Sequence, residues 1–439
     1  MGNGDAISRI HNSRPKGFDL TMGIINVAEL KPDMMLADDL ANLDGRFLLA
    51  KGTKLTPKHL LILKMWGVIE ANIENVSRID IEADAISRLD PSVIEEVKQS
   101  LADRFQHVDL EHPSIRELFR ICCIREGRKR SGALNKRKLR TPETDKKTID
   151  PSYRISKSTT AKIDPNELIR DDVKLPSLPT MYVQISEAIN RPNSSASDIA
   201  KVISKDTGLS ARLLKIVNST FYGFPSKIDT LSRAVAIVGT RQLSTLALGM
   251  NIISVFRKIP SDLIHMRSFW EHSLSCGICA RIIGSYKKIL NTERVFVAGL
   301  LHDIGRLILY SYVPIQARNA LIKARQDDDL LHNSEHEILG FDHSMIGGLL
   351  LKKWKLPVSL ENSVKYHHSP QKSKDPLEPA IIHIADIMTN AIGRGSSGER
   401  FVPALNPDAW KSLDLSPNIL SSTIKQMERQ IEEIIQLLF

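Results

Sequence analysis

The stretch Val295-Phe-Val-Ala-Gly-Leu-Leu-His-Asp-Ile-Gly-Arg306 decides how this chain of 439 residues is interpreted. It is an apolar run of helical length that ends in the adjacent pair His302 and Asp303 and stops at Gly305. A charged side chain at the end of a buried run needs partners, because an unpaired buried charge is expensive. Imidazole nitrogen and carboxylate oxygen together also suit a divalent transition metal. The pair therefore predicts a buried polar cluster or a metal site in a helical domain.

Other histidines and carboxylates recur around this pair at positions that fit helices. One precedes the pair and the rest follow it: His272, His343, His367, His368 and Asp386. A metal ion needs such ligands to converge from separate elements, each oriented by a neighbouring group. A single buried histidine, in contrast, is more often a hydrogen-bonded core residue. We expect that role, or a place at the surface, for four others: His265, His332, His336 and His383.

The order of these residues, H…HD…D, resembles that of the HD superfamily, whose members are all-helical and often metal-dependent phosphohydrolases. Flanking motifs narrow the resemblance to the HDOD branch, which is regarded mainly as a signalling and interaction module. The motifs are Leu175-Pro-Ser-Leu-Pro-Thr180, Asp206-Thr-Gly-Leu-Ser-Ala-Arg-Leu-Leu214, Val217-Asn-Ser219 and the HDIGR stretch. The resemblance spans residues 170–400 and implies an all-helical HDOD domain there.

In the related HD-GYP phosphodiesterases, the matching positions hold a centre of two or three metal ions. The resemblance therefore implies metal ligands, for Fe, Mn, Zn or Ni, at His272, His302, Asp303, His343, His367, His368 and Asp386. Asp303 and Arg306 would be the catalytic residues of an active enzyme. Two departures argue against activity on cyclic di-GMP. Arg306 stands where those enzymes have lysine, which keeps the charge but not the shape, and no Gly-Tyr-Pro signature follows His368.

The fold class that we predict is mainly α, with a small α+β module ahead of the HDOD domain. In the module, Asp44-Gly45 indicates a hairpin, and Thr56-Pro57 indicates the start of a helix that ends at Gly67. We expect five successive segments: a disordered N-terminus (1–22), the α+β module with following helices (23–124), a basic flexible linker (125–165), the HDOD domain (166–400), and a loop with a C-terminal amphipathic helix (401–439).

The net charge of +9 is concentrated in the predicted linker. Residues 125–150 hold ten Lys/Arg and four Asp/Glu, a net charge of +6. A solvated tether is the simpler explanation. The alternative is a nucleic-acid patch at residues 125–147, but no aromatic side chains interleave the basic ones for base stacking. We therefore do not expect a nucleic-acid partner.

The four cysteines do not make a disulfide framework in so long a chain, which fits a reducing compartment. We expect buried thiols at Cys122 and Cys123 rather than a metal site. Cys276 and Cys279 follow His272 on its helical face, and we favour apolar packing over zinc or redox chemistry. No run of 18 apolar residues and no signal peptide is visible, so we expect a cytoplasmic protein without a membrane span.

These features together predict a bacterial-type signal transduction protein whose HDOD domain is a degenerate HD module for interaction. Its partners would be signalling proteins or a nucleotide second messenger, and its C-terminal helix would pack on the domain or form a homodimer contact. The alternative is a metal-dependent phosphodiesterase that acts on a cyclic dinucleotide or a related phosphate ester. The feature that divides the two is whether the metal centre is occupied and open.

Overall fold

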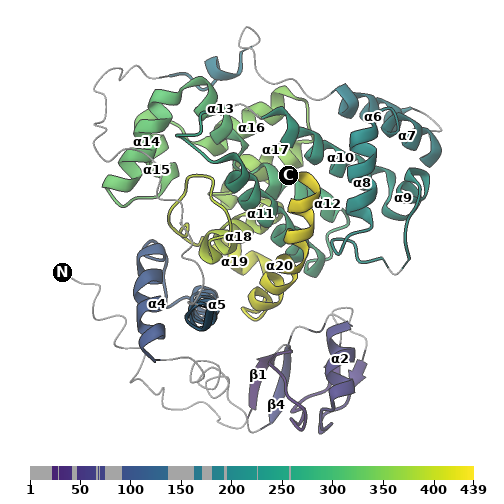
Figure 1. Ribbon diagram of the computed structural model, residues 1–439, viewed down its shortest axis with the longest axis vertical. Coiled ribbons are helices and arrows are strands. Elements are labelled where there is room, and N and C mark those ends of the chain that lie inside the picture. Colours follow the sequence, from purple (N-terminus) through teal and green to yellow (C-terminus); the bar gives the residue numbers. More distant parts are fainter. Residues whose placement is uncertain are drawn as a thin grey trace. The chain divides into compact units, whose positions relative to one another are not determined.

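The computed structural model is mainly helical, as predicted (Figure 1). It describes residues 22–27, 29–41, 47–65, 68, 70–74, 91–136, 163–170, 180–191, 195–224, 226–256 and 259–439. The expected disordered segment before Met22 lies outside these residues. The chain divides into two compact units, Met1–Pro91 and Ser92–Phe439, and each is described by itself.

The N-terminal unit is the α+β module that the sequence predicts. Its elements are β1 (Met22–Asn26), β2 (Leu40–Ala41), β3 (Phe47–Leu49), α2 (Pro57–Met65) and β4 (Glu70–Glu74). β1 pairs with β4 in antiparallel register, and β2 pairs with β3. Apolar side chains from all parts of the unit, such as Ile25, Leu36, Leu63 and Ile73, form one core. The predicted turn at Asp44-Gly45 lies outside the described residues.

Two helices that we assigned to this module belong to the second unit instead. They are α4 (Pro91–Arg104) and α5 (Pro113–Lys136). α5 packs on α18 and α20 of the helical unit, and the Cys122 thiol donates to the carbonyl of Ala391. The Arg104 guanidinium donates to the same carbonyl. The predicted module boundary after residue 124 is therefore wrong, because these long-range contacts hold both helices on the second unit.

The predicted basic linker also begins too early. α5 continues to Lys136 instead of ending near Ile124, and Arg125 forms an ion pair with Glu428 of α20. Arg130 pairs with Glu96 across to α4. The first basic residues of this segment are thus part of a packed helix rather than a tether. Residues 137–162 lie outside the described part of the chain.

The first lobe of the helical unit follows the sequence closely. Its elements are η2 (Glu167–Ile169), α6 (Thr180–Asn190), α7 (Ala196–Ile203), α8 (Thr207–Val217), α9 (Leu231–Val238) and α10 (Thr240–Val255). Ser195 and Asp198 form a capping box at α7, and Asp206 and Thr230 cap α8 and α9 through their side chains. These caps satisfy backbone N–H groups that a helix start leaves free.

The second lobe surrounds α11, which lies against α12, α18 and α20 (Figure 1). Its elements are α11 (Met266–Tyr286), α12 (Thr292–Leu301), α13 (Ile304–Tyr312), α14 (Pro314–Gln326), α15 (Leu331–Leu339), α16 (His343–Lys353), α17 (Val358–Lys365), η3 (Pro370–Lys372), α18 (Leu377–Ile392), α19 (Pro407–Leu413) and α20 (Ile419–Leu438). α12 and α13 are the two halves of the apolar stretch quoted at the outset, and they meet at His302 and Asp303.

The C-terminal helix α20 docks on its own domain, which was one of the two predicted outcomes. It packs against α11, α5 and α8. The apolar side chains Ile424, Met427, Ile431 and Ile434 are all buried. Isolated helices of this length are marginal in water, so these contacts explain why the helix forms.

One described stretch, Thr292–Tyr312, is long and apolar enough to pass a test for a membrane span by length and composition. Of its most apolar window, 89% is buried among the other helices. Its hydropathy is therefore explained by its place in the core of the helical unit.

Two glycines allow α11 and α12 to touch through their backbones. A Cβ atom on Gly277 would lie 2.6 Å from the carbonyl oxygen of Phe296, and one on Gly299 would lie 2.7 Å from the Cα of Gly277. No side chain fits at either position without moving a helix. This close contact fixes the distance between His272 on α11 and His302 at the end of α12.

We expect Gly277→Ala to lower the free energy of unfolding by about 2 kcal/mol or more, because the added methyl group meets backbone atoms. The matched control is Gly284→Ala on the same helix, where a Cβ would meet only Val295 at 3.8 Å. That change should be neutral or stabilising by up to about 1 kcal/mol through helix propensity. Urea denaturation of the two variants measures the difference, and equal effects would contradict the backbone contact.

Candidate metal centre

The seven predicted ligands come from six helices and the turns beside them. His272 lies on α11, His302 follows the last turn of α12, and Asp303 is the N-cap residue of α13. His343 begins α16, His367 and His368 follow α17, and Asp386 lies on α18. The structure brings all seven together in two adjoining groups.

The inner group is His272, His302, Asp303 and Asp386. The Nε2 atoms of His272 and His302 are 3.4 Å apart. Oδ1 of Asp386 lies 3.2 Å from Nε2 of His272 and 3.3 Å from Nε2 of His302. Oδ2 of Asp303 lies 3.5 Å and 3.2 Å from the same two nitrogens. Two imidazole nitrogens and two carboxylate oxygens thus converge on one point.

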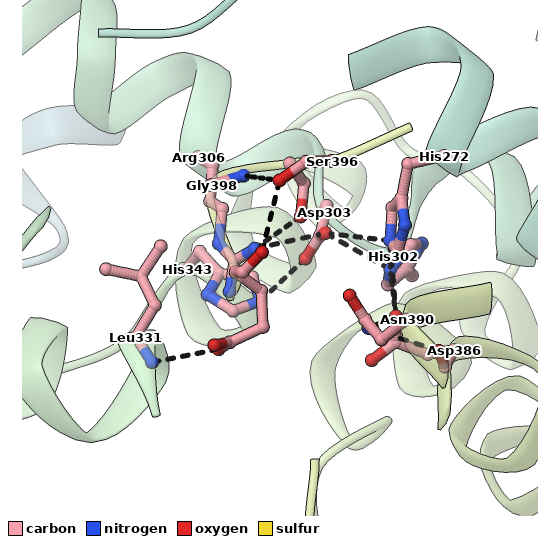
Figure 2. Close-up of polar contacts among 12 residues, drawn as sticks. His272, His302, Asp303, Arg306, Leu331, His343, Asp386, Asn390, Ser396 and Gly398 are labelled. Carbon is pink, nitrogen blue, oxygen red and sulfur yellow. Dashed lines mark hydrogen bonds and ion pairs between the residues drawn. The ribbon is translucent and has the colours of Figure 1, made fainter. Parts of the chain in front are cut away.

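The outer group is His343, His367 and His368, whose potential ligand atoms lie within 4.8 Å of one another. Nε2 of His343 is 3.1 Å from Nε2 of His368 and 2.8 Å from Oδ1 of Asp303. Asp303 therefore presents one oxygen to each group. Figure 2 shows its carboxylate between His343 on one side and His272 and His302 on the other.

Two of the histidines, His302 and His367, are oriented as metal ligands usually are. Nδ1 of His302 contacts the carbonyl oxygen of Gly299 at 2.7 Å, and Nδ1 of His367 contacts that of Val364 at 2.7 Å. A backbone carbonyl only accepts, so each Nδ1 carries a proton and each Nε2 is left with a lone pair in the neutral ring. Nε2 of His367 is buried and has no hydrogen-bond partner. This pattern of an outer partner on Nδ1 and a free inner Nε2 fits a divalent metal.

A third close backbone contact places His343. A Cβ atom on Gly305 would lie 1.9 Å from the carbonyl oxygen of His343 and 2.8 Å from the backbone nitrogen of Gly347. The start of α13 therefore lies directly against the start of α16. This explains why the HDIGR stretch has glycine at its fourth position, two residues after Asp303.

Arg306 is the one cation of the arginine or lysine type that contacts the seven ligands in the described structure. Its guanidinium NH1 lies 3.3 Å from Oδ2 of Asp303 and 2.5 Å from Oγ of Ser397, and its Nε lies 3.2 Å from Glu335. Its side chain is only 2% exposed. Burial would lower the pKa of Arg306, but Asp303 and Glu335 raise it above its ordinary value. The guanidinium therefore stays charged and bound to the central carboxylate.

The carboxylates of the centre stay ionised in spite of their burial. Burial would raise the pKa of Asp303, but Arg306 and the neighbouring histidines hold it well below its ordinary value. Burial would likewise raise the pKa of Asp386, but hydrogen bonds from His272 and His302 lower it. Each oxygen is thus available to a cation, whether a proton on a histidine or a metal ion.

The histidines divide into two kinds in the metal-free protein. Burial opposes protonation of His302, but Asp303 raises its pKa well above the ordinary value. Burial and Arg306 oppose protonation of His343, but Glu335 and Asp303 raise its pKa to about 9. Burial and the charge on His302 lower the pKa of His367 to about 3. The protonated rings of His302 and His343 therefore offset the negative charge of the carboxylates, while the ring of His367 stays neutral.

Three contributors to the centre were missed by the sequence reasoning. Glu335 accepts from Nδ1 of His343 at 2.5 Å and from its backbone N–H at 3.0 Å. Ser397 binds Arg306, and His332 stacks on His368 with ring centroids 4.2 Å apart. Glu335 and Ser397 lie outside any motif that we used, and His332 was assigned to the core or surface. One signal was available in the sequence. His332 and Glu335 lie three residues apart, which places both on the same face of one helix.

Other predicted roles agree with the structure. His383 is a buried core residue, because its Nδ1 contacts the carbonyl of His367 and its Nε2 accepts from the backbone N–H of Asn406. Cys276 and Cys279 are buried free thiols. Burial raises the pKa of both, so neither is a reactive thiolate. Burial likewise raises the pKa of Cys122 and of Cys123 to about 12.

The inner group is closed to solvent. Exposure is 0% for His272 and His302, 3% for Asp303 and 5% for Asp386. The loop at residues 394–401 contributes to this closure, because Ser397 binds Arg306 and the backbone N–H of Ser396 donates to the backbone carbonyl of Ser268 on α11. His368, in the outer group, is partly exposed. His368 is therefore the one partly exposed member of the seven predicted ligands.

The helical fold and the H…HD…D cluster define an HD-type domain. Residues 175–370 match the family model of the HDOD domain. The chain therefore contains an HDOD domain, as the sequence motifs predict. An uncharacterized protein from Treponema pallidum (strain Nichols) is 28% identical over 223 residues, which cover 49% of this chain and 41% of that protein. The match spans less than half of that relative's length.

Two solved structures share the fold. An HDOD domain protein of unknown function from Geobacter sulfurreducens has a TM-score of 0.54 and 22% identity, and the match covers 63% of this chain and 97% of that one. A protein from Shewanella amazonensis SB2B, named provisionally as a phosphohydrolase, has a TM-score of 0.50 and 22% identity over 62% of this chain and 98% of its own. At this identity the likeness establishes the fold alone.

The raised pKa of His343 predicts how the metal-free protein responds to pH. Its stabilising charge is fully present below the unfolded pKa of about 6.5 and is lost as the pH rises through about 9. We expect the chelator-treated protein to lose roughly 2 to 3 kcal/mol of unfolding free energy between those values. Urea denaturation across this range measures the loss. The loss should be smaller in His343→Gln, which keeps only the contribution of His302, and an equal loss in that variant would contradict the assignment.

Proposed function

We propose that this chain is a regulatory protein whose HDOD domain acts by interaction, and that its buried centre holds a divalent transition metal as a structural ion. The observation that carries the proposal is the ion pair between Arg306 and Asp303, which is buried from solvent. It occupies one oxygen of the central carboxylate with a fixed protein cation. A hydrolytic site needs that region for substrate and for water.

The donor set supports a metal ion in the inner group. His272, His302, Asp303 and Asp386 supply two nitrogens and two oxygens, which suit Fe, Mn, Zn or Ni. Glu335, the carbonyl of Gly299 and the amide of Asn390, which donates to Oδ1 of Asp386 at 2.8 Å, orient these ligands and His343. A bound ion would supply the positive charge that the imidazolium of His302 supplies in its absence. Binding must therefore release protons.

The closed surroundings support a structural ion over a catalytic one. A catalytic metal keeps an open position for water or substrate. Here the inner ligands are buried, and Arg306 is tied to the 394–401 loop through Ser397. The segment that follows His368 also lacks the Gly-Tyr-Pro signature of the related phosphodiesterases. A signalling module that acts by interaction needs no open metal position for water or substrate.

A metal-dependent phosphodiesterase is the second candidate, and one observation favours it. Asp303 faces both groups, which is the arrangement of a carboxylate that bridges two metal ions. His368 in the outer group is partly exposed, so a phosphate ester would approach from its side. Turnover would then need the outer group to bind a metal with an open position.

The partner also remains a proposal. Signalling proteins or a nucleotide second messenger fit a regulatory HDOD domain. The basic residues at the start of the predicted linker, which belong to α5, are poorly placed to bind nucleic acid. Arg125 and Arg130 already pair with Glu428 and Glu96. Their charge is therefore partly neutralised within the helical unit.

Metal analysis of the purified full chain by mass spectrometry tests the structural ion. We expect stoichiometric metal in the wild type, none in His302→Ala or Asp303→Ala, and less in His272→Ala or Asp386→Ala. His336→Ala is the matched control, because His336 is exposed on α15, and it should keep full metal content. Thermal unfolding should show that chelation lowers the melting temperature. Metal-free wild type purified without chelator would contradict the proposal.

A hydrolysis assay on cyclic dinucleotides and bis(4-nitrophenyl) phosphate separates the two candidates. We expect no turnover above background by the metal-loaded protein. Arg306→Lys provides a further arm, because lysine restores the residue of the related enzymes while it loses the bidentate guanidinium. Turnover by the wild type that disappears in Asp303→Ala would replace the regulatory proposal with the enzyme.

A further inference from the structure

A second site lies apart from the histidine cluster, at a cavity of about 320 Å³ in the helical unit. Its lining comes from α8, α10, the start of α11 and the end of α20. This volume is in the range of small-molecule pockets, which start at about 300 Å³. None of the seven candidate metal ligands lines it.

The cavity has an apolar wall. Met250 and Ile253 of α10, Phe256 directly after that helix and Trp270 of α11 line it, and all four side chains are at most 8% exposed. Trp270 also packs edge-on against Phe269, with ring centroids 5.0 Å apart. These four side chains belong to the core of the domain, whereas Phe439, which also lines the cavity, is 50% exposed.

Two arginines provide the polar side of the cavity. Arg212 of α8 and Arg267 of α11 both line it. Within the described residues, neither guanidinium has an ion pair, and Nε of Arg212 is shielded from solvent without a hydrogen-bond partner. A buried polar atom without a partner is costly. Two unpaired cations beside an apolar wall fit a ligand with a negative head and an apolar body.

We propose that this cavity binds a small amphipathic anion, with Arg212 and Arg267 on its carboxylate and the apolar wall on its hydrocarbon part. Guanidinium groups bind carboxylates through paired N–H donors, which gives direction as well as charge. Trp270 and the side chains of α10 supply the burial that drives an apolar group out of water. The site is independent of the proposed metal centre, so either proposal stands without the other.

The test is isothermal titration calorimetry of the full chain with octanoate, octan-1-ol and inorganic phosphate. Octanoate carries both features of the ligand, the alcohol lacks the charge, and phosphate lacks the apolar body. We expect saturable binding of one octanoate per chain and at least tenfold weaker binding of the other two probes. Equal affinity for the alcohol or for phosphate, or no saturable binding of octanoate, overturns the proposal.

Arginine variants assign the binding to this cavity. Arg212→Gln and Arg267→Gln should each lower the octanoate affinity at least fivefold, because glutamine keeps hydrogen bonding but not the charge. Arg241→Gln is the matched control, since Arg241 is exposed on α10 and does not line the cavity; its affinity should match the wild type. Circular dichroism checks that all three variants fold. Unchanged affinity in both lining variants means that octanoate binds elsewhere and overturns the proposal.

Discussion

The centre depends on helices that approach one another closely enough for their backbones to touch. Gly277 and Gly299 meet where α11 crosses α12, and Gly305 lies against the carbonyl of His343 at the start of α16. Side chains at these positions would separate the helices by the width of a methyl group or more. The distances of 3.2–3.5 Å among the inner ligands would then be lost. These three glycines therefore determine the distances among polar side chains that lie elsewhere on the same helices.

The same closeness creates an electrostatic problem that the protein solves locally. Asp303, Asp386 and Glu335 are buried together, where a lone carboxylate would be expensive. Three positive charges offset these carboxylates in the metal-free protein. They are the guanidinium of Arg306 and the protonated rings of His302 and His343, whose pKa values are raised. A divalent ion bound to the inner group, as we propose, would replace the proton on His302 rather than add its full charge to the carboxylates. Metal binding and protonation of His302 would then be alternatives at one centre.

The sequence predicted which histidines and aspartates come together far better than it predicted their surroundings. The ligand order and the HDIGR motif were sufficient because each residue lies at a helix end or on a helix face that local spacing reveals. Glu335 and Ser397 could not be predicted, because they reach Arg306 through contacts across 29 and 91 residues of sequence. The helix at residues 125–136 was mistaken for a tether for the same reason. Its basic composition resembles a solvated segment until Glu428, far along the chain, is seen to pair with Arg125.

We propose that a metal ion occupies the closed inner group while Arg306 remains on Asp303. Anomalous X-ray diffraction from crystals of the full chain, purified without chelator and recorded at the absorption edge of the bound metal, tests it directly. We expect a peak among His272, His302, Asp303 and Asp386, with the guanidinium of Arg306 still paired to Asp303 and the 394–401 loop in place. A centre without a peak and with histidines bonded directly to the carboxylates would contradict it. So would a metal pair with an open channel to solvent and a displaced Arg306.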